Sequence, residues 1–94
     1  MDINTRVHNR VHTRIRMLGG RVDDWEVFDY CMEKSLRQAK DFCNADEFPE
    51  EAETYLVEWA AADYLTETDG YSKQWERMRI DAEKGLVGFR RMRW

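Results

Sequence analysis

Residues 48–65 read FPEEAETYLVEWAAADYL, and this stretch decides the fold of the chain. Pro49 has a backbone dihedral φ that already suits the first turn of a helix, where its missing N–H is not needed. Glu50, Glu51 and Glu53 then place negative charge at the positive end of the helix dipole. We therefore expect a helix that begins near Pro49.

The side chains of this helix are apolar around most of its circumference. Only Glu51, Thr54 and Glu58 form a narrow polar sector, and most of the rest is aliphatic, aromatic or alanine. This pattern predicts that the helix is contacted on several sides, so we expect it to lie at the centre of the molecule.

A second helix is predicted upstream, from Asp23 or Asp24 as N-cap to about Cys43. Asn44 suits the left-handed residue that ends such a helix, and Phe48 can fold against the start of the central helix. We therefore expect an antiparallel helical hairpin over residues 23–66. One apolar arc of the second helix comprises Trp25, Phe28, Cys31, Met32, Ser35, Leu36, Ala39, Phe42 and Cys43. The predicted core comprises Phe28, Met32, Leu36, Phe42, Phe48, Leu56, Trp59 and Ala60.

Two further helices are predicted from apolar residues that recur every three or four positions. Residues 1–20 form a basic N-terminal helix that Gly19 and Gly20 end, and residues 70–94 form a C-terminal helix and tail. Gly85 and Gly88 weaken the last helix by about 1 kcal/mol each relative to Ala. The two apolar stripes are Ile3, Val7, Val11, Ile15 and Leu18, and then Trp75, Met78, Ala82, Leu86 and Phe89.

The composition agrees with a helical protein. At 94 residues the chain has room for one hydrophobic core, and it has one proline and no alternating apolar run. We predict one all-α domain over residues 1–94, a small antiparallel bundle of about four helices built on the central hairpin.

Charge is distributed unevenly along the chain. The net charge is −4, but residues 1–22 carry +4, residues 23–69 carry −12 and residues 70–94 carry +4. This pattern suits head-to-tail or ring assembly of copies, with basic ends against an acidic middle. Alternatively, the ends fold back onto the acidic middle of the same molecule.

Cys31 and Cys43 are the only cysteines, and on one helix they would lie about 18 Å apart, too far for a disulfide. Two unpaired thiols and no recognisable signal peptide favour synthesis in the cytoplasm. Without an apolar run of roughly 20 residues, we expect no membrane span. Without C-x-x-C spacing or a Cys/His cluster, we expect neither a zinc site nor a cofactor.

His8 and His12 lie one helical turn apart and could present imidazoles to one metal ion. Asn9 occupies the position at which zinc metalloproteases of this motif carry their catalytic Glu, which excludes that activity. Without a third ligand, the pair is better interpreted as a solvated flank of the first helix.

Asp63 is the one acid that projects into the apolar arc of the central helix. We interpret it as the partner of an arginine from the first or last helix rather than as a catalytic group. No Ser/His/Asp order, glycine-rich phosphate loop or distinct carboxylate pair indicates an enzyme.

Two groups of residues are candidate contact sites. Arg6, Arg10 and Arg14 could reach nucleic-acid phosphates or a neighbouring subunit, although a pI of 5.2 disfavours a dedicated nucleic-acid binder. The tail combines residue types that are enriched at interface hot spots, although it could also tuck onto its own helices. Its residues are Phe89, Arg90, Arg91, Met92, Arg93 and Trp94.

The hairpin carries KSLRQAKDFCN at residues 34–44, then a short acidic turn, Phe48-Pro49, and VEWAAADYL at residues 57–65. Over about residues 23–66 it resembles the small head-tail connector proteins of tailed bacteriophages, also called adaptor or head-completion proteins. In that family a helix ends on an aromatic-Cys-Asn-like turn and a proline starts the next helix, which carries a Glu-x-Ala-x-x-x-Tyr-like pattern.

The resemblance implies a structural virion protein without catalysis. Connector subunits form a ring of about twelve copies beneath the portal protein and lengthen the channel through which DNA enters and leaves the capsid. The implied partners are other copies, the portal, the next neck or tail-completion protein, and the DNA in the channel. The implied location is the neck of the virion, after assembly in the host cytoplasm.

The resemblance also assigns contacts. Arg6, Arg10 and Arg14 become candidates for the channel surface or a neighbouring subunit, and residues 89–94 for the portal or a subunit interface. The long arginine-rich first helix and the lack of an obvious Gly/Ser-rich loop after the central helix depart from the family. The alternative is a small helical nucleic-acid-associated regulatory protein that uses the arginines of the first helix.

Overall fold

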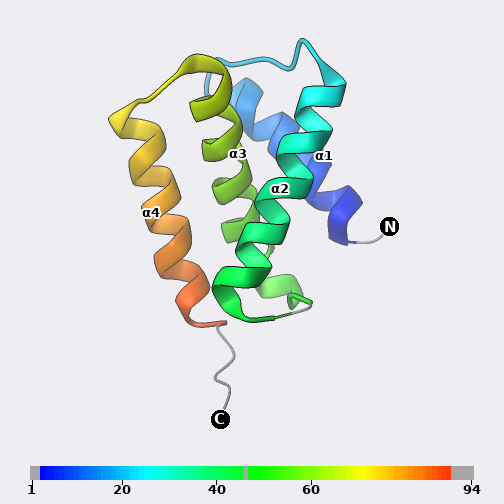
Figure 1. Cartoon of the computed structure of the whole chain (residues 1–94), viewed down its shortest axis with the longest axis vertical. Helices are drawn as coiled ribbons and strands as arrows, with labels where there is room; N and C mark the ends of the chain where they lie inside the picture. The colour runs from blue at the N-terminus through cyan, green and yellow to red at the C-terminus, as the bar shows by residue number, and fades with distance from the viewer. Residues whose placement is uncertain (1–2, 46, 90–94) are drawn as a thin grey trace.

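A computed structural model describes residues 3–45 and 47–89, and within these ranges the chain forms helices and turns without a strand. The elements are α1 (Ile3–Met17), α2 (Trp25–Cys43), a short 3-10 helix η1 (Glu50–Ala52), α3 (Glu53–Asp69) and α4 (Lys73–Val87). The predicted all-α bundle of four helices is confirmed (Figure 1).

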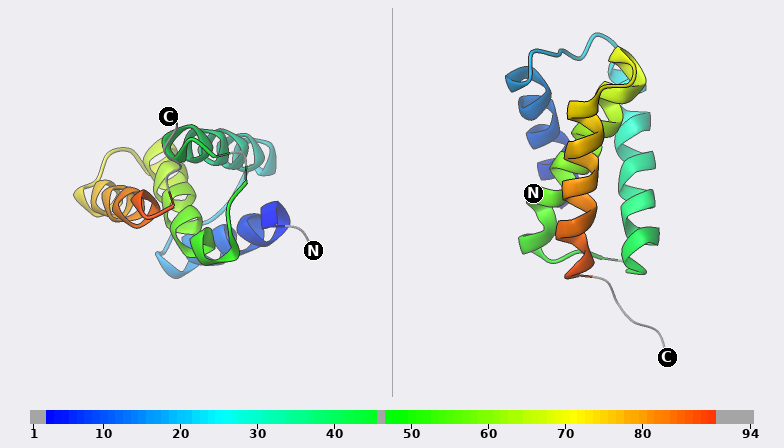
Figure 2. Two further views of the ribbon diagram at one scale, coloured as in Figure 1. Left: turned by 90° about the horizontal axis from the view of Figure 1, so that it is seen from below. Right: turned by 90° about the vertical axis from the view of Figure 1, so that its left-hand side faces the viewer.

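Helix α3 lies at the centre of the bundle, and α1, α2 and α4 each pack against it. Figure 2, in the view from below, shows α4 on one side of α3 and the pair α1 and α2 on the other. The apolar circumference of α3 is buried, as the sequence pattern predicts, except at Tyr55, which is 37 % exposed. The buried apolar residues of α3 are Leu56, Val57, Trp59, Ala60, Ala61, Ala62, Tyr64 and Leu65.

The ends of the hairpin helices follow local capping chemistry. The side chain of Asp24 accepts hydrogen bonds from the backbone N–H groups of Glu26 and Val27, at 3.0 and 3.3 Å. Asn44 ends α2 in the left-handed conformation, with φ 53° and ψ 44°. These two caps fix both ends of α2, the first helix of the hairpin.

The start of α3 differs in detail from the prediction. Pro49 precedes the first turn, and the N–H of Ala52 donates to the carbonyl of Pro49 at 3.0 Å. A 3-10 turn therefore leads into α3, which becomes α-helical at Glu53.

The core joins all four helices. From α1, the side chains of Val7, Val11 and Ile15 are fully buried. Six of the eight residues predicted for the core are buried, whereas Phe42 and Phe48 are only half-buried against the same cluster. The six are Phe28, Met32, Leu36, Leu56, Trp59 and Ala60.

Trp25 lies on the apolar arc of α2 but is not part of the buried core. Its side chain is 54 % exposed, because Trp25 is the first residue of α2 and has few neighbours there. Its ring lies beside His12 of α1, with 4.9 Å between ring centroids. The indole therefore covers the edge of the bundle instead of filling it.

Gly85 allows α4 to approach α3 closely. A Cβ atom at this position would overlap the ring of Tyr55. The sequence alone marks Gly85 as a weak point of the last helix, but in the structure its missing side chain makes room for an aromatic ring.

Candidate interaction surfaces

The three arginines predicted to contact a DNA channel or a neighbour lie on α1 facing α3. Arg14 donates to both carboxylate oxygens of Glu58, at 2.8 and 3.4 Å. Arg6 and Arg10 both approach Glu53, at 3.3 and 3.4 Å. At these three positions, the basic first helix folds back onto the acidic middle of the same chain. This is the second of the two arrangements that the charge pattern suggested, the other being contact between copies.

Glu53 takes part in two of these ion pairs, a role that the sequence did not indicate. It is only 7 % exposed, although the periodicity placed it simply in the acidic first turn of the helix. Two guanidinium groups next to it offset the cost of burying its carboxylate. Its spacing of five residues from Glu58 was visible in the sequence, but the arginines opposite were not.

A groove of about 310 Å³ runs beside these ion pairs, between α1 and α3. It is lined by Asn9, Arg10, Thr13, Arg14, Met17, Thr54, Val57 and Glu58. Because the arginines of the groove already bind carboxylates, an incoming phosphate would have to displace an existing ion pair.

Asp63 forms the centre of a polar cluster between α2, α3 and α4. Its two carboxylate oxygens accept from the hydroxyl of Ser35, at 2.8 Å, and from the guanidinium of Arg79. Arg79 also lies over the ring of Trp59, with its Cζ atom 3.8 Å from the ring centroid. The expected partner for Asp63 is thus an arginine of the last helix, and the arrangement is that of a structural ion pair.

A cleft of about 280 Å³ opens beside this cluster. Cys31 lines it, and burial, reinforced by the charge of Glu67, raises the pKa of the Cys31 thiol. A raised pKa keeps the thiol protonated and poorly nucleophilic near neutral pH. The side chains that surround the cleft therefore favour a structural role for Cys31.

The two histidines of α1 pack against aromatic rings of α2. The ring of His8 lies 6.1 Å from that of Phe28, in an edge-on arrangement, and the ring of His12 lies 4.9 Å from that of Trp25 and 6.3 Å from that of Phe28, measured between centroids. Within residues 3–45 and 47–89, no group of three or more His, Cys, Asp or Glu side chains could hold a metal ion.

The candidate tail lies mostly outside the described residues. Residues 90–94 are not described, and of the tail only Phe89 is placed. Its side chain is half-buried, and its ring centroid lies 6.3 Å from that of Tyr55. Phe89 therefore belongs at least partly to the bundle.

The outward face of α4 is a charged surface that the sequence reasoning missed. Lys73, Arg77, Ile80, Lys84 and Val87 recur at intervals of four, three, four and three, and all are exposed. We call this row the basic stripe. Its spacing is a detectable signal in the sequence, on the face opposite the apolar residues that predict the helix.

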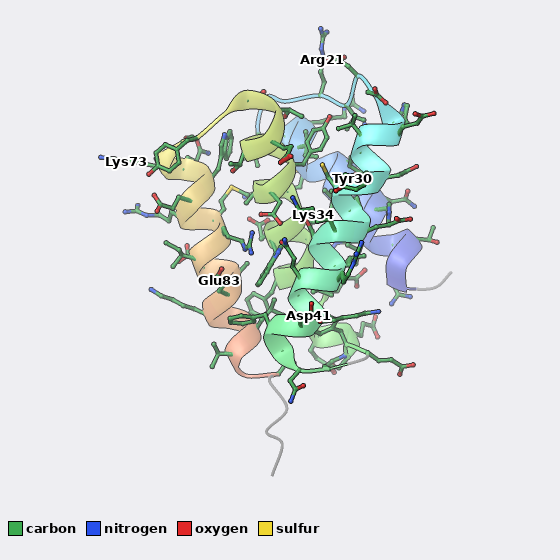
Figure 3. The ribbon with its side chains drawn as sticks, viewed as in Figure 1. Arg21, Tyr30, Lys34, Asp41, Lys73 and Glu83 are labelled. Atoms are coloured by element: carbon green, nitrogen blue, oxygen red, sulfur yellow. The ribbon has the colours of Figure 1, made fainter. Side chains whose placement is uncertain are left out.

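The outward face of α2 carries the opposite charge near its start. Glu26, Asp29, Tyr30 and Glu33 share one side of the helix and are all exposed. We call this row the acidic stripe. Figure 3 shows Tyr30 on α2, well separated from Lys73 at the start of α4.

Within the described part of the chain, no helix is both long and apolar enough to cross a membrane. The sequence matches no family model, and comparison of the chain with curated proteins and with solved structures also gives no match.

Proposed function

We propose that this chain is a structural connector subunit of a tailed bacteriophage. It would form a ring under the portal protein, extend the DNA channel in the neck of the virion, and receive the next neck or tail-completion protein. In this proposal the chain provides binding surfaces and no catalytic group, and it assembles in the host cytoplasm.

The observation that carries the proposal is the helical hairpin. The segments that resemble connector proteins, residues 34–44 and 57–65, are the second half of α2 with its left-handed Asn44 and the buried middle of α3. Helix α3 is held on several sides, so the hairpin is suited to act as a rigid body. A rigid body with charged outer faces is what a subunit needs when it is held by neighbours around a channel.

The decisive experiment is assembly with a portal ring. Purified protein should bind a portal ring of the same phage and form closed rings, measured by native mass spectrometry and electron microscopy. Deleting residues 89–94 should abolish docking on the portal. Because Phe89 packs near Tyr55, a second deletion of residues 90–94 tests the tail while keeping this contact.

Both deletions need an unchanged far-UV circular dichroism spectrum to be interpretable. If both deletion variants still dock on the portal, the tail is not the portal contact. A protein that binds no portal ring and forms no ring at any concentration would contradict the proposed function as a whole.

The alternative, a nucleic-acid-associated regulator, depends on the arginines of α1. Arg6, Arg10 and Arg14 each have a carboxylate of α3 within 3.4 Å, so their charge is largely neutralised inside the molecule. Salt-dependent DNA binding by the monomer, lost when the three are replaced by alanine, would favour this alternative.

A further inference from the structure

The exposed faces of α2 and α4 carry complementary chemistry. On the basic stripe, Lys73, Arg77 and Lys84 have no carboxylate within ion-pair distance among the residues that the structure describes. Ile80 lies between them and is 41 % exposed. The basic stripe thus combines three unpaired cations with an apolar centre.

The acidic stripe likewise combines three charged residues, here acids, with an exposed residue of largely apolar surface. Glu26, Asp29 and Glu33 likewise have no ion-pair partner in residues 3–45 and 47–89. Tyr30 lies beside them with 62 % of its side chain exposed. Residues 23–33 contain five acids and no lysine or arginine, so this end of α2 is strongly acidic, and basic residues begin only at Lys34.

The two stripes cannot meet inside one molecule. Helices α2 and α4 both pack on α3 (Figure 2). The residues of each stripe are exposed and lie opposite the buried residues of the same helix. A molecule with complementary faces in two different places associates head to tail, and such contacts close into a ring when the rotation between copies allows it.

We propose that the basic stripe of one copy docks on the acidic stripe of a second copy. The exposed Ile80 and Val87 favour a protein partner over a phosphate backbone, which would pair only with the cations. The overall charge of −4 also disfavours a polyanion. The acidic stripe is the shorter of the two, because residues 26–33 span about 10 Å of helix and residues 73–87 about 21 Å, so it covers about half of the basic stripe.

This contact deepens the proposed function by naming the subunit interface, and it relies on that function only for ring closure. It also changes which basic residues are expected to contact a neighbouring copy. Arg6, Arg10 and Arg14 of α1 are neutralised by α3, whereas the cations on the outer face of α4 remain available to a neighbour.

The test is charge reversal with exchange of partners. The first variant is Lys73→Glu/Arg77→Glu/Lys84→Glu, and the second is Glu26→Lys/Asp29→Lys/Glu33→Lys. Self-association is measured for the protein alone by sedimentation velocity at low and high salt. Each variant by itself should associate roughly tenfold more weakly than the parent or worse, because like charges then face each other.

Mixing the two variants, or combining both sets of changes in one chain, should restore association. A matched control, Lys34→Glu/Arg37→Glu/Lys40→Glu, makes the same change of net charge as the first variant but leaves both stripes intact. Because Arg37 lies one helical turn from Glu33, this change extends the acidic surface of α2, so the control should associate at least as strongly as the parent. Far-UV circular dichroism verifies that every variant remains helical.

Several outcomes would overturn the inference. These are a parent that stays monomeric at about 100 μM and low salt, a first variant that associates like the parent, and a mixture that fails to recover. DNA binding that the first variant loses, without any self-association of the parent, would assign the basic stripe to phosphates instead.

The inference and the proposed function can fail separately. Head-to-tail association that follows the exchange pattern, in a protein that does not bind a portal, would keep the interface and reject the connector role. Rings that form on the portal equally well with either charge-reversal variant would keep the connector role and reject the interface.

Discussion

Gly85 of α4 lies directly against the aromatic ring of Tyr55 on α3, at a place where a side chain of any size would overlap the ring. Tyr55 in turn lies 6.3 Å from the ring of Phe89, measured between centroids. The packing of α4 on α3 at this point therefore depends on a glycine, a residue that intrinsic helix propensity disfavours.

Replacing Gly85 by alanine is expected to destabilise the fold by about 1–3 kcal/mol, because Tyr55 or the whole of α4 must shift to relieve the overlap. This loss exceeds the roughly 1 kcal/mol by which alanine favours a helix over glycine. Urea unfolding followed by far-UV circular dichroism measures the difference.

The matched control is Gly88→Ala. Gly88 has a helical φ of −64°, and the nearest atom to an added Cβ is the carbonyl oxygen of Gly85 at 3.7 Å, an ordinary contact. This variant should be neutral or up to about 1 kcal/mol more stable. A Gly85→Ala chain that is as stable as Gly88→Ala would contradict the close packing of Tyr55.

Asp63→Ala should destabilise the protein by about 1–3 kcal/mol, because it removes the acceptor of Ser35 and one of the two carboxylates that pair with the half-buried Arg79, leaving that of Glu83. Asp81→Ala, at an exposed position of α4, should change the free energy of unfolding by no more than about 0.5 kcal/mol.

A double-mutant cycle isolates the ion pair itself. The chain with both Asp63→Ala and Arg79→Ala should lose less stability than the sum of the two single changes, with a coupling energy of roughly 0.5–3 kcal/mol. Strict additivity would show that the two side chains do not interact.

Glu53→Ala should lower the free energy of unfolding by about 1 kcal/mol, whereas Glu51→Ala should have almost no effect. Glu53 is buried between Arg6 and Arg10, and Glu51 is exposed. Because both arginines are more than one third exposed, the contribution of each pair is small and should shrink in high salt. Equal effects of the two changes would contradict the buried position of Glu53.

Stability should fall at alkaline pH. Burial raises the pKa of Cys31 above its ordinary value of 9.0 and the pKa of Tyr64 above its ordinary value of 10.0. Above these ordinary values, the unfolded chain releases protons that the folded chain still holds, so rising pH favours unfolding. The stabilisation is complete below pH 9 and is lost as the pH passes through the raised values.

Urea unfolding between about pH 8 and pH 11 measures this dependence. Tyr64→Phe removes the phenol and should make the fall above about pH 10 shallower, whereas Cys31→Ala should remove the part that begins near pH 9. If both variants follow the pH dependence of the parent, these two groups are not responsible for it.

Much of the fold was predictable because its signals are local. The apolar periodicity of each helix, the N-cap Asp24 and the left-handed Asn44 act within a few residues of chain, and the structure contains each of them. Trp25 fits the same periodicity but is exposed, because the position of a residue along a helix also decides whether a neighbour covers it.

The candidate surfaces were less predictable. Arg6, Arg10 and Arg14 could be recognised in the sequence as a charged row, but not their partners. The pairs of Arg6 with Glu53 and Arg14 with Glu58 join residues 47 and 44 positions apart. Whether the row meets solvent, a neighbour or its own chain depends on which face of α3 lies opposite.

The sequence by itself determined four helices, a central α3 and an uneven distribution of charge, because periodicity, capping and composition are properties of short segments. Only the tertiary structure decided how that charge is used. It neutralises the arginines of α1 against Glu53 and Glu58, places Gly85 against Tyr55, and leaves the basic stripe of α4 and the acidic stripe of α2 exposed. The physical reason is that ion pairing and close packing depend on which helix faces meet, and the packing of the other helices around α3 decides this.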